Sequence, residues 1–481
     1  MTTTADHDCE WKSEALALRE KIAGLESVRE QNAALEARLD KLERALFGKK
    51  SEKQPRAAKL TPPVDPAQSK QKRQENAETL QALPEVRIEH PVPDDHKACP
   101  KCGGEAKRPM PPKLSEQWEY VPGHFEHRVH VRHVLACGCG EHIVTAPVPA
   151  KVIDRGKDGP GLCAHAVVSK CADAIPLHRL AKMFARAGVP VSDRTLGELF
   201  HLSAELLTPI YDALMRKIAA DEVVQADETP LQVQAPGKTK RAYVWTFLSG
   251  DRIGYRFSPS RSGLTPLAVL GGTNGTLVVD AYTGYNATCT PDQRERAACL
   301  AHVRRKFHDA QSSAPEAAAE AMRLILAVYR VEHEAKRLGV VRTPAHRELR
   351  QTAGKAAMAA LHDWLLEQKP QHLPKSPMGG AISYALGQWP ALQVFLENPA
   401  VPIDNNASER ALRIVALGRK NFLFVGNDDA GQNLAVLMSL VRSCEAVGVN
   451  PQEYLADVLM RVQDWPAARV EELLPENWNA A

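Results

Sequence analysis

The sequence contains no hydrophobic run that approaches the roughly 18 apolar residues of a membrane span. Its first residues also lack the basic-then-apolar order of a signal peptide, so we expect a cytoplasmic protein with no membrane partner. The net charge is only +3, so any affinity for nucleic acid has to come from local basic stretches. A G-x-S-x-G nucleophile motif is missing as well, and no cysteine stands in a recognisable nucleophile context. Covalent catalysis is therefore not indicated.

The composition is that of a soluble globular protein, with 44% hydrophobic and 25% charged residues. A length of 481 residues predicts two to four domains at about 100–200 residues each. We do not expect the ten cysteines of a cytoplasmic chain to form a disulfide framework, because that compartment keeps thiols reduced. Clustered cysteines are instead expected at metal or catalytic sites.

A heptad pattern occupies residues 12–48, which we interpret as a coiled-coil or leucine-zipper helix. Leu18, Leu25, Asn32, Leu39 and Leu46 fall seven apart, and a second seam position is filled by Val28, Leu35 and Leu42. An asparagine in such a seam specifies register and favours a dimer. The alternative is a single amphipathic helix that packs on its own domain.

A basic stretch follows the heptads. Residues 44–74 hold nine Lys or Arg against two acids, together with four prolines, so this part cannot bury enough apolar surface to fold. We interpret residues 49–85 as a disordered linker. The same charges also suit an arm that contacts DNA phosphates.

Residues 86–150 contain two short cysteine pairs, Cys99 with Cys102 and Cys137 with Cys139. Two thiolate pairs in glycine-rich turns can occupy the corners of one tetrahedron, so a structural Zn²⁺ site is predicted, with a β-rich stretch between the pairs. His133 or His142 would be able to replace one ligand, because the second pair is C-x-C and not the commoner C-x-x-C. The alternative is four buried free thiols.

Residues 160–215 are predicted to be helical. In residues 176–200, two short helices flank a turn at Gly188 and Pro190, with Ser192 or Asp193 as the cap of the second helix. This is compatible with a helix-turn-helix, in which the start of the second helix reaches DNA. The candidate DNA-binding residues of this region are Arg179, Lys182, Arg194 and Thr195.

From residue 222 the pattern changes to strands. EVVQAD is predicted to be a buried strand that ends at Asp227, and GTLVVD a second one that ends at Asp280. Between them we expect a hairpin turning at residues 250–251 and a short helix. A further short strand and a helix from about Arg304 should follow. Aspartate is a poor strand former, so its presence at two strand ends needs either a turn or a functional explanation.

Residues 311–400 are rich in alanine and predicted to be a helical insertion, after which DNNASERALRIVALGRKNFLFVG contains Glu409. Two structural roles would account for the presence of Glu409. It would form either a capping box with Asn406, three residues earlier, or an ion pair with Arg413, four residues later. Alternatively, Glu409 joins the two strand-end aspartates. Candidate DNA-binding cations near these acids are Arg304, Arg305, Lys306, Arg410, Arg413, Arg419 and Lys420.

Three carboxylates brought together would suit Mg²⁺, or Mn²⁺, because hard cations prefer oxygen ligands. Two such ions about 3.5–4 Å apart stabilise the attacking and leaving oxygens of an in-line phosphoryl transfer. Cys299 and His302 would supply only two metal ligands, which is too few for a metal site. We therefore expect this pair to have a structural role.

Nine segments make the chain resemble the large transposases of the insertion-sequence-66 family: LFGKKSEK, CPKCGG, ADETPLQV, SRSG, VVDAYTGYN, CLAHVRRKF, DNNASERALRIVALGRKNFLFVG, NPQEYLADVL and ELLPENW. They occur in the family order and extend over nearly all of the chain after about residue 45. The resemblance implies an RNase H-like α/β core with a DDE triad, which falls on Asp227, Asp280 and Glu409. It departs from the family at the C-x-C pair and at Ala281, where glycine is commoner.

The resemblance also implies an N-terminal helical zipper, a zinc module before the core, and DNA as partner, both as terminal inverted repeats and as target. We expect a homo-oligomer, in the first place a dimer, that is nucleoid-associated when DNA is bound; accessory transposition proteins are a further class of partner. The core is expected in three parts: residues 220–310, then the insertion, then 401–440 with the catalytic helix, followed by a C-terminal element at 441–481. Two alternatives remain open, a dimeric zinc and helix-turn-helix regulator without catalysis, and a metal-dependent nuclease of the same fold.

Overall fold

The computed structural model describes residues 158–479 continuously, and before them Gln74, residue 123, residues 125–131, 133–136, 143–145 and 151–152, and residue 156. The chain divides into two units, Met1–Glu119 and Tyr120–Ala481. The predicted coiled coil at 12–48 and nearly all of the linker at 49–85 lie outside the described residues. So do the four predicted zinc ligands.

A two-stranded antiparallel ribbon occurs within the predicted zinc module. Val134–Ala136 forms β1 and Ile143–Thr145 forms β2, with Leu135 opposite Val144. Of the described residues between the two cysteine pairs, only β1 forms a strand, and residues 125–131 are exposed and belong to no strand. The connection between β1 and β2 contains the second cysteine pair in the sequence.

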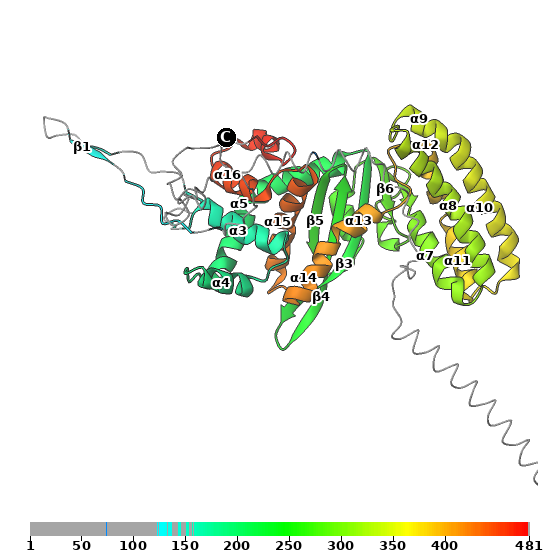
Figure 1. The fold of residues 1–481 in the computed structure, drawn as a ribbon, viewed down its shortest axis with the longest axis horizontal. Helices are drawn as coiled ribbons and strands as arrows, with labels where there is room; N and C mark the ends of the chain where they lie inside the picture. The colour runs from blue at the N-terminus through cyan, green and yellow to red at the C-terminus, as the bar shows by residue number, and fades with distance from the viewer. Residues whose placement is uncertain are drawn as a thin grey trace, which may run out of the picture. The chain divides into compact units, whose positions relative to one another are not determined.

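The central element is a five-stranded mixed sheet with the strand order β5-β4-β3-β6-β7 (Figure 1). Two hairpins join β3, β4 and β5, which pair antiparallel, whereas β3, β6 and β7 run parallel. The predicted order of three antiparallel strands, a helix and two more strands is confirmed. The elements are β3 (Val223–Ala235), β4 (Lys238–Ser249), β5 (Arg252–Ser258), α6 (Leu264–Leu270), β6 (Gly275–Val279), the 3-10 turn η2 (Thr283–Tyr285) and β7 (Arg294–Ala298).

Two predicted boundaries are wrong. The first strand does not end at Asp227 but continues to Ala235, because Leu231 and Val233 alternate inward and are fully buried. Pairing with β4 continues along this whole length, and its hydrogen bonds outweigh the poor strand propensity of aspartate. The helix expected from about Arg304 already begins at Leu300.

The register of the sheet assigns its side chains to two faces. Asp227 is opposite Thr246, which is opposite Tyr255, so these three side chains share one face. The phenol of Tyr255 donates to the carbonyl of Ala411 at 2.7 Å, so the C-terminal helices cover this face. These elements are α13 (Asn406–Ala411), α14 (Arg413–Phe422), α15 (Asp428–Ala446), α16 (Pro451–Arg461) and the 3-10 helix η6 (Ala467–Leu473).

The opposite face packs on the long helix α5 (Asp193–Ala220). Gly254 has no side chain, and Met215 and Ile218 of α5 occupy the space where a Cβ would lie. Phe247, which is opposite Gly254, is fully buried on the same face. One large hydrophobic core therefore joins the sheet with α5, α15 and α16.

A second core lies in a layer of helices beyond β7. Phe307, Ile325, Leu361 and Ile382 are fully buried there, and Val278 of β6 joins them. The predicted helical character of residues 311–400 is confirmed. The layer contains α7 (Leu300–Asp309), η3 (Ala310–Ser312), α8 (Pro315–Arg337), α9 (Pro344–Leu349), the π-helical turn η4 (Arg350–Gly354), α10 (Lys355–Gln368), η5 (Lys369–Gln371), α11 (Pro377–Gly387) and α12 (Trp389–Glu397).

The predicted helix-turn-helix region forms α3 (Pro160–Cys171), α4 (Leu177–Arg186) and α5. The turn at Gly188 is confirmed, with φ of 86°, and the Ser192 hydroxyl accepts a hydrogen bond from the backbone N–H of Thr195 as the cap. The second helix is not short, however, because α5 has 28 residues and continues under the sheet. Within the part of the chain that the structure describes, no helix is long and apolar enough to cross a membrane.

Candidate active site

Asp227 and Asp280 occupy corresponding positions on neighbouring parallel strands. Gln225 of β3 is paired with Val278 of β6, and each aspartate stands two residues further along its own strand direction. Since side chains alternate with a period of two, both aspartates are on the face that the C-terminal helices cover. The sheet therefore places two carboxylates from distant sequence positions side by side.

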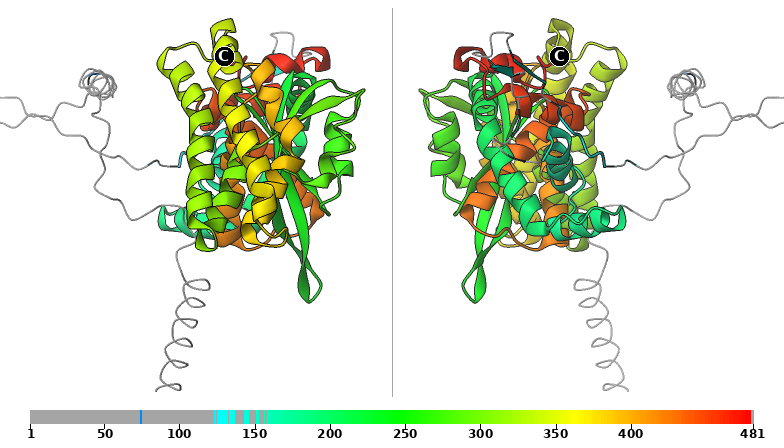
Figure 2. Two further views of the ribbon diagram at one scale, coloured as in Figure 1. Left: turned by 90° about the vertical axis from the view of Figure 1, so that its right-hand side faces the viewer. Right: turned by 90° about the vertical axis from the view of Figure 1, so that its left-hand side faces the viewer.

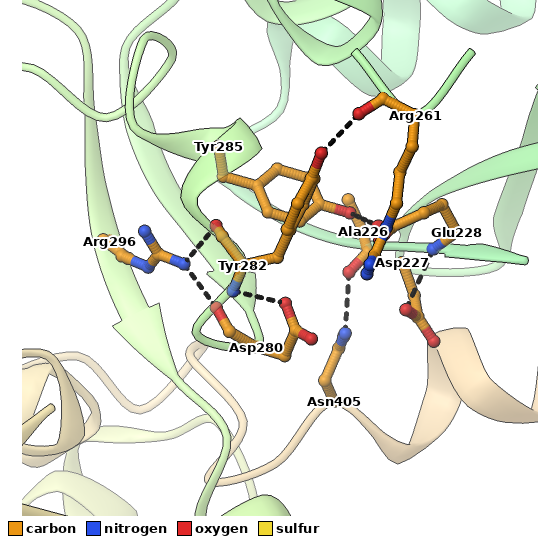
Figure 3. Close-up of polar contacts among 9 residues, drawn as sticks. All are labelled: Ala226, Asp227, Glu228, Arg261, Asp280, Tyr282, Tyr285, Arg296 and Asn405. Carbon is orange, nitrogen blue, oxygen red and sulfur yellow. Dashed lines mark hydrogen bonds and ion pairs between the residues drawn. The ribbon is translucent and has the colours of Figure 1, made fainter. Parts of the chain in front are cut away.

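Asn405 ties the helix that carries Glu409 to the first of these strands. It is 1% exposed, and its side-chain amide donates to the carbonyl of Ala226 at 2.7 Å (Figure 3). Its amide oxygen accepts a hydrogen bond from the Ser408 hydroxyl at 2.7 Å. Because Ala226 directly precedes Asp227, this contact anchors α13 next to the first aspartate.

The expected capping by Asn406 is wrong. The residue at the cap position is Asn405, whose buried side chain is committed to Ala226, and the N–H of Asn406 donates to the Asp404 carboxylate at 3.1 Å. Asp404 also accepts from the phenol of Tyr329 at 3.1 Å. The unusual Asp-Asn-Asn run is thus an anchor that joins α13 to the sheet and to the helical layer.

Glu409 points toward the cations of α7. Its carboxylate lies 3.3 Å from the guanidinium of Arg305 and 3.7 Å from the imidazole of His302. Neither the cap nor a pair with Arg413 explains this side chain among the described contacts. Glu409 is therefore free of the two structural roles that the sequence left open for it.

Asp227 has an unusual acidity. Burial is the largest cause that raises the pKa of its carboxyl group to about 7, and the charges of Glu228, Asp280 and Glu409 act in the same direction. The backbone N–H of Glu228 donates to its Oδ1 at 2.9 Å and opposes this rise. Asp280 and Glu409, and with them Glu228, therefore lie near enough to Asp227 for their charges to add to the effect of burial.

The donor set fits a hard divalent cation. Carboxylate oxygens are the ligands that Mg²⁺ prefers, and a cation beside Asp227 would offset the burial, and the added repulsion from its neighbours, that raise its pKa. Among the described residues, however, no three His, Cys, Asp or Glu side chains stand at metal-binding distance of one another. The carboxylates of Asp227, Asp280 and Glu409 are neighbours. They do not converge on one point, because Glu409 is turned toward Arg305.

Glu228 is a residue whose importance the sequence did not reveal. Its side chain is 2% exposed and projects to the face opposite Asp227. The guanidinium of Arg261 donates to its Oε1 at 2.7 Å, and the phenol of Tyr285 donates to its Oε2 at 2.7 Å. The pKa of Tyr285 is raised well above its usual value by burial, and the Glu228 charge adds to the rise. Both oxygens of this buried carboxylate are therefore satisfied.

The same network reaches Asp280 (Figure 3). The guanidinium of Arg261 lies 4.0 Å from the centre of the Tyr282 ring, and the Tyr282 phenol donates to the Arg261 carbonyl. The backbone N–H of Tyr282 donates to Asp280 Oδ1 at 2.9 Å. Arg296 of β7 donates to the carbonyls of Asp280 and Tyr282. A continuous chain of contacts thus connects Glu228, beside one aspartate, with the other aspartate.

The signals for these residues were present in the motifs ADETPLQV, SRSG and VVDAYTGYN. Each motif contributes one part of the network, namely Glu228, Arg261 and the two tyrosines. Nothing in the linear sequence pairs them, because they come together only when β3, the loop after β5 and the turn after β6 assemble. The contacts between Glu228, Arg261 and the two tyrosines are therefore visible only in the folded structure.

Cys299 has the structural role expected for it. It is 2% exposed, and its sulfur accepts a hydrogen bond from the backbone N–H of Asn405 at 3.1 Å. Burial raises the pKa of its thiol to about 11, so it remains protonated near neutral pH. His302 is three residues on and faces Glu409.

The predicted DNA-binding cations fall into three groups. Arg179 and Lys182 are exposed on α4, and Arg194 is exposed at the start of α5, whereas Thr195 is half-buried in the helix cap. A second group on α7 is Arg304, Arg305 and Lys306, and a third on α13 and α14 is Arg410, Arg413, Arg419 and Lys420. Arg419 is half-buried and donates to the carbonyl of Pro230 at 2.6 Å, so it is partly a structural residue.

A mixed five-stranded sheet with coupled acids on two parallel strands and on a covering helix is consistent with the RNase H-like domain of DDE transposases. Comparison with protein families agrees. Residues 155–433 match the model described as the IS66 family transposase, residues 439–475 its C-terminal element, and residues 96–140 the zinc-finger binding domain of the IS66 transposase. The chain belongs to the IS66 family of transposases, a family of DDE enzymes of phosphoryl transfer.

Similar proteins occur in Sinorhizobium fredii. The protein y4jD is 34% identical over 450 residues, which is 89% of this chain and 87% of that protein. The protein y4qI is 33% identical over 421 residues, or 83% of this chain and 76% of that one. Both are described as uncharacterized, so they support the relationship and add no activity.

The raised pKa of Asp227 predicts how stability depends on pH without metal. An unfolded aspartate has a pKa of about 3.9, so between about pH 4 and pH 7 the folded state binds more protons. Stability should therefore fall as the pH rises through this window and stay low above it. Asp227→Asn removes the penalty, at most about 4 kcal/mol at about 1.4 kcal/mol per pKa unit.

In EDTA, the melting temperature of Asp227→Asn is expected to exceed that of the wild type at pH 8, and the difference should shrink toward pH 4. Asp251→Asn, an exposed aspartate in the turn between β4 and β5, is the control and should show no such trend. Equal melting temperatures of Asp227→Asn and wild type at pH 8 would contradict the raised pKa.

Loss of Arg261 should destabilise the fold because Glu228 would remain buried without its cation. We expect Arg261→Ala to cost roughly 2–4 kcal/mol, and less when Glu228→Gln is present, since the second change removes the buried charge. Arg323→Ala, which breaks a fully exposed pair with Glu320, is the control and should leave the melting temperature near that of the wild type. Thermal melts of Arg261→Ala, Glu228→Gln, the double variant and the wild type measure the coupling, and additive effects would disprove it.

Proposed function

We propose that this protein is a DDE transposase that cuts the ends of an insertion sequence and joins them to target DNA, with Asp227, Asp280 and Glu409 as the catalytic acids. The observation that carries the proposal is the electrostatic coupling of these three carboxylates, from β3, from the end of β6 and from α13, on one face of the sheet. Membership of the IS66 family makes phosphoryl transfer on DNA the reaction class.

The three acids would hold divalent metal ions, Mg²⁺ or Mn²⁺, which supply Lewis acidity for the attacking and leaving oxygens when bound. Asp227 and Asp280 hold fixed positions, because the sheet, the Tyr282 N–H and Asn405 position the backbone around them. Glu409 is the adjustable member, since its present partners Arg305 and His302 are side chains. Release of Glu409 from Arg305 would complete the set.

Arg305 then becomes available to the substrate. It is exposed on α7, next to Lys306, and its guanidinium has the fork geometry that suits a DNA phosphate. In this proposal a scissile phosphate entering the site displaces the carboxylate of Glu409 from Arg305, so substrate binding and assembly of the acids are coupled. Asp227, with its pKa of about 7, is also able to hold a proton until the cation enters.

The other parts of the chain would serve the same reaction. The module that contains Cys99, Cys102, Cys137 and Cys139 matches a zinc-finger domain, so a zinc ion with these four ligands is proposed. α4 and the start of α5 carry Arg179, Lys182 and Arg194, which would contact the element ends. The heptads at 12–48 would pair two chains, which brings two active sites to two ends.

Replacement of each acid should abolish chemistry without abolishing DNA binding. We expect Asp227→Asn, Asp280→Asn and Glu409→Gln to lower strand cleavage of an end-containing duplex in Mg²⁺ by at least about 10³-fold. Binding should persist, because basic surfaces elsewhere carry it. Asp429→Asn, at an exposed acid on α15, is the control with wild-type cleavage.

The outcome also separates the alternatives. Wild-type cleavage in Asp227→Asn would remove that residue from the site, and a regulator without catalysis would show no metal-dependent cleavage at all. A nuclease of the same fold would give cleaved ends without joined products. Joined products that depend on all three acids establish the transposase.

Zinc content tests the second metal. Full-length protein purified without chelators should contain about one zinc per chain, because four thiolates leave no open position. The double variant Cys99→Ser/Cys102→Ser should lose this zinc, whereas Cys289→Ser, a half-buried cysteine between β6 and β7, should retain it. Far less than one zinc per chain in the wild type would refute the site.

A further inference from the structure

The hairpin between β3 and β4 extends beyond the rest of the sheet (Figures 1 and 2). β5 pairs with β4 only from Tyr243 onward, and β6 pairs with β3 only up to Gln225. The turn consists of Pro236 and Gly237, and φ of 67° at Gly237 suits a glycine after proline. A hairpin that projects beyond the sheet and has little hydrophobic core of its own is a candidate binding surface.

The tip of this hairpin, residues 236–241, is exposed and basic. It holds Lys238, Lys240 and Arg241, and no acid occurs anywhere in residues 229–250. Lys240 makes one exposed ion pair with Asp428 at 2.7 Å, and Asp429 is the adjacent acid on α15. Such an exposed pair is weak, so a phosphate can compete for the lysine.

A second exposed feature lies against the same hairpin. The backbone of Val425 exchanges hydrogen bonds with Gln232 and Gln234 at 2.9 and 2.8 Å, which fastens the segment after α14 to β3. Just before it, Leu423 is 65% exposed and Phe424 38% exposed. We call these two residues the apolar turn.

The apolar turn has a strained backbone. Leu423 has φ of 60° and ψ of −49°, and the N–H of Phe424 donates to the carbonyl of Phe422 at 2.6 Å, which makes a γ-turn. A positive φ in a branched residue other than glycine is costly and tends to persist where function requires it. Here the strain holds two apolar side chains toward solvent.

A basic track connects this turn with the candidate active site. Arg410, Arg413 and Lys420 are exposed at helical spacing along α13 and α14, starting next to Glu409, and no acid occurs in residues 410–427. From Arg410 to Leu423 the helices span about 20 Å, or roughly six base-pair steps. The track is therefore long enough to follow a DNA backbone that leaves the site and runs along α14.

Resting on the proposed function, we propose that the basic track, the apolar turn and the hairpin tip form one DNA-binding surface that holds the duplex next to the cut. The cations of the track and the tip bind phosphates, which positions the DNA. The apolar turn enters between bases, as the apolar side chains of minor-groove-binding proteins frequently do. The absence of acids along the track favours nucleic acid over a protein partner.

The hairpin tip is tested by the salt dependence of binding. The full chain is titrated with a labelled 40-base-pair duplex of mixed sequence, with Ca²⁺ in place of Mg²⁺ to prevent cleavage. Lys238→Ala/Lys240→Ala/Arg241→Ala should lower the slope of log affinity against log salt by about 2–3, at roughly 0.9 for each phosphate that the variant no longer neutralises. The melting temperature should stay near that of the wild type, because these side chains are exposed.

A matched variant with three exposed lysines of the helical layer replaced, Lys336→Ala/Lys355→Ala/Lys375→Ala, controls for net charge and should leave the slope near the wild-type value. An unchanged slope in the hairpin variant, or an equal decrease in the control, overturns the proposed surface. Loss of self-association in the hairpin variant, measured by sedimentation with the slope unchanged, would assign the tip to a protein interface and also overturns it.

The apolar turn is tested on the duplex that carries an inverted repeat from beside the coding region. Wild-type protein should make one or more thymines reactive to permanganate, and Leu423→Ala/Phe424→Ala should lose this reactivity while the salt slope is kept. Identical permanganate patterns in the two proteins overturn the role of the turn. Failure of the proposed function looks different: cleavage would then be independent of Asp227 while the salt slopes remain as described.

Discussion

Burial of Asp227 within β3, beside the neighbouring acids Asp280 and Glu409, is the constraint around which the described core is arranged. The parallel register places Asp227 and Asp280 side by side, and α13 adds Glu409 on the same face. Burial together with these neighbours raises the pKa of Asp227 to about 7. Neighbouring buried carboxylates lower the stability of the folded state at neutral pH, because each charge makes ionisation of the others more costly. Stability alone would therefore not select this cluster of acids. The hydrogen bonds and ion pairs of the surrounding residues hold these acids in place.

The contacts that hold the acids differ between the two faces of the sheet. On the face opposite Asp227, the buried Glu228 is neutralised by Arg261 and Tyr285, and Tyr282 carries the connection to Asp280. On the face of the acids, Asn405 binds α13 to the carbonyl of Ala226. The fixed backbone holds two acids still, whereas Glu409 depends on a side-chain contact with Arg305. In the proposed mechanism, this difference would let Glu409 leave Arg305 when a DNA phosphate binds.

The surface follows from the same arrangement. α13 and α14 are held against β3 by Asn405, by Arg419 and by the bonds of Val425, so the cations along them start at the candidate active site. The projecting β3–β4 hairpin continues this basic surface past the strained turn at Leu423. Asp227 lies on β3, the strand that leads into this hairpin, so a duplex held by the hairpin would have a defined position relative to this candidate acid.

The sequence by itself determined the strand and helix order of the core, the zinc module and the three candidate acids, because apolar periodicity, cysteine spacing and family motifs are local signals. It also suggested the wrong end for β3, the wrong cap for α13 and a second helix that was too short, since tertiary packing overrides local preference at those places. Only the tertiary structure decided that Glu228 is buried with Arg261, that Glu409 faces Arg305, and that residues 423–424 lie against the hairpin. The physical reason is separation along the chain: Asn405 and Ala226 are 179 residues apart, and no local pattern encodes which distant groups will share one hydrogen bond.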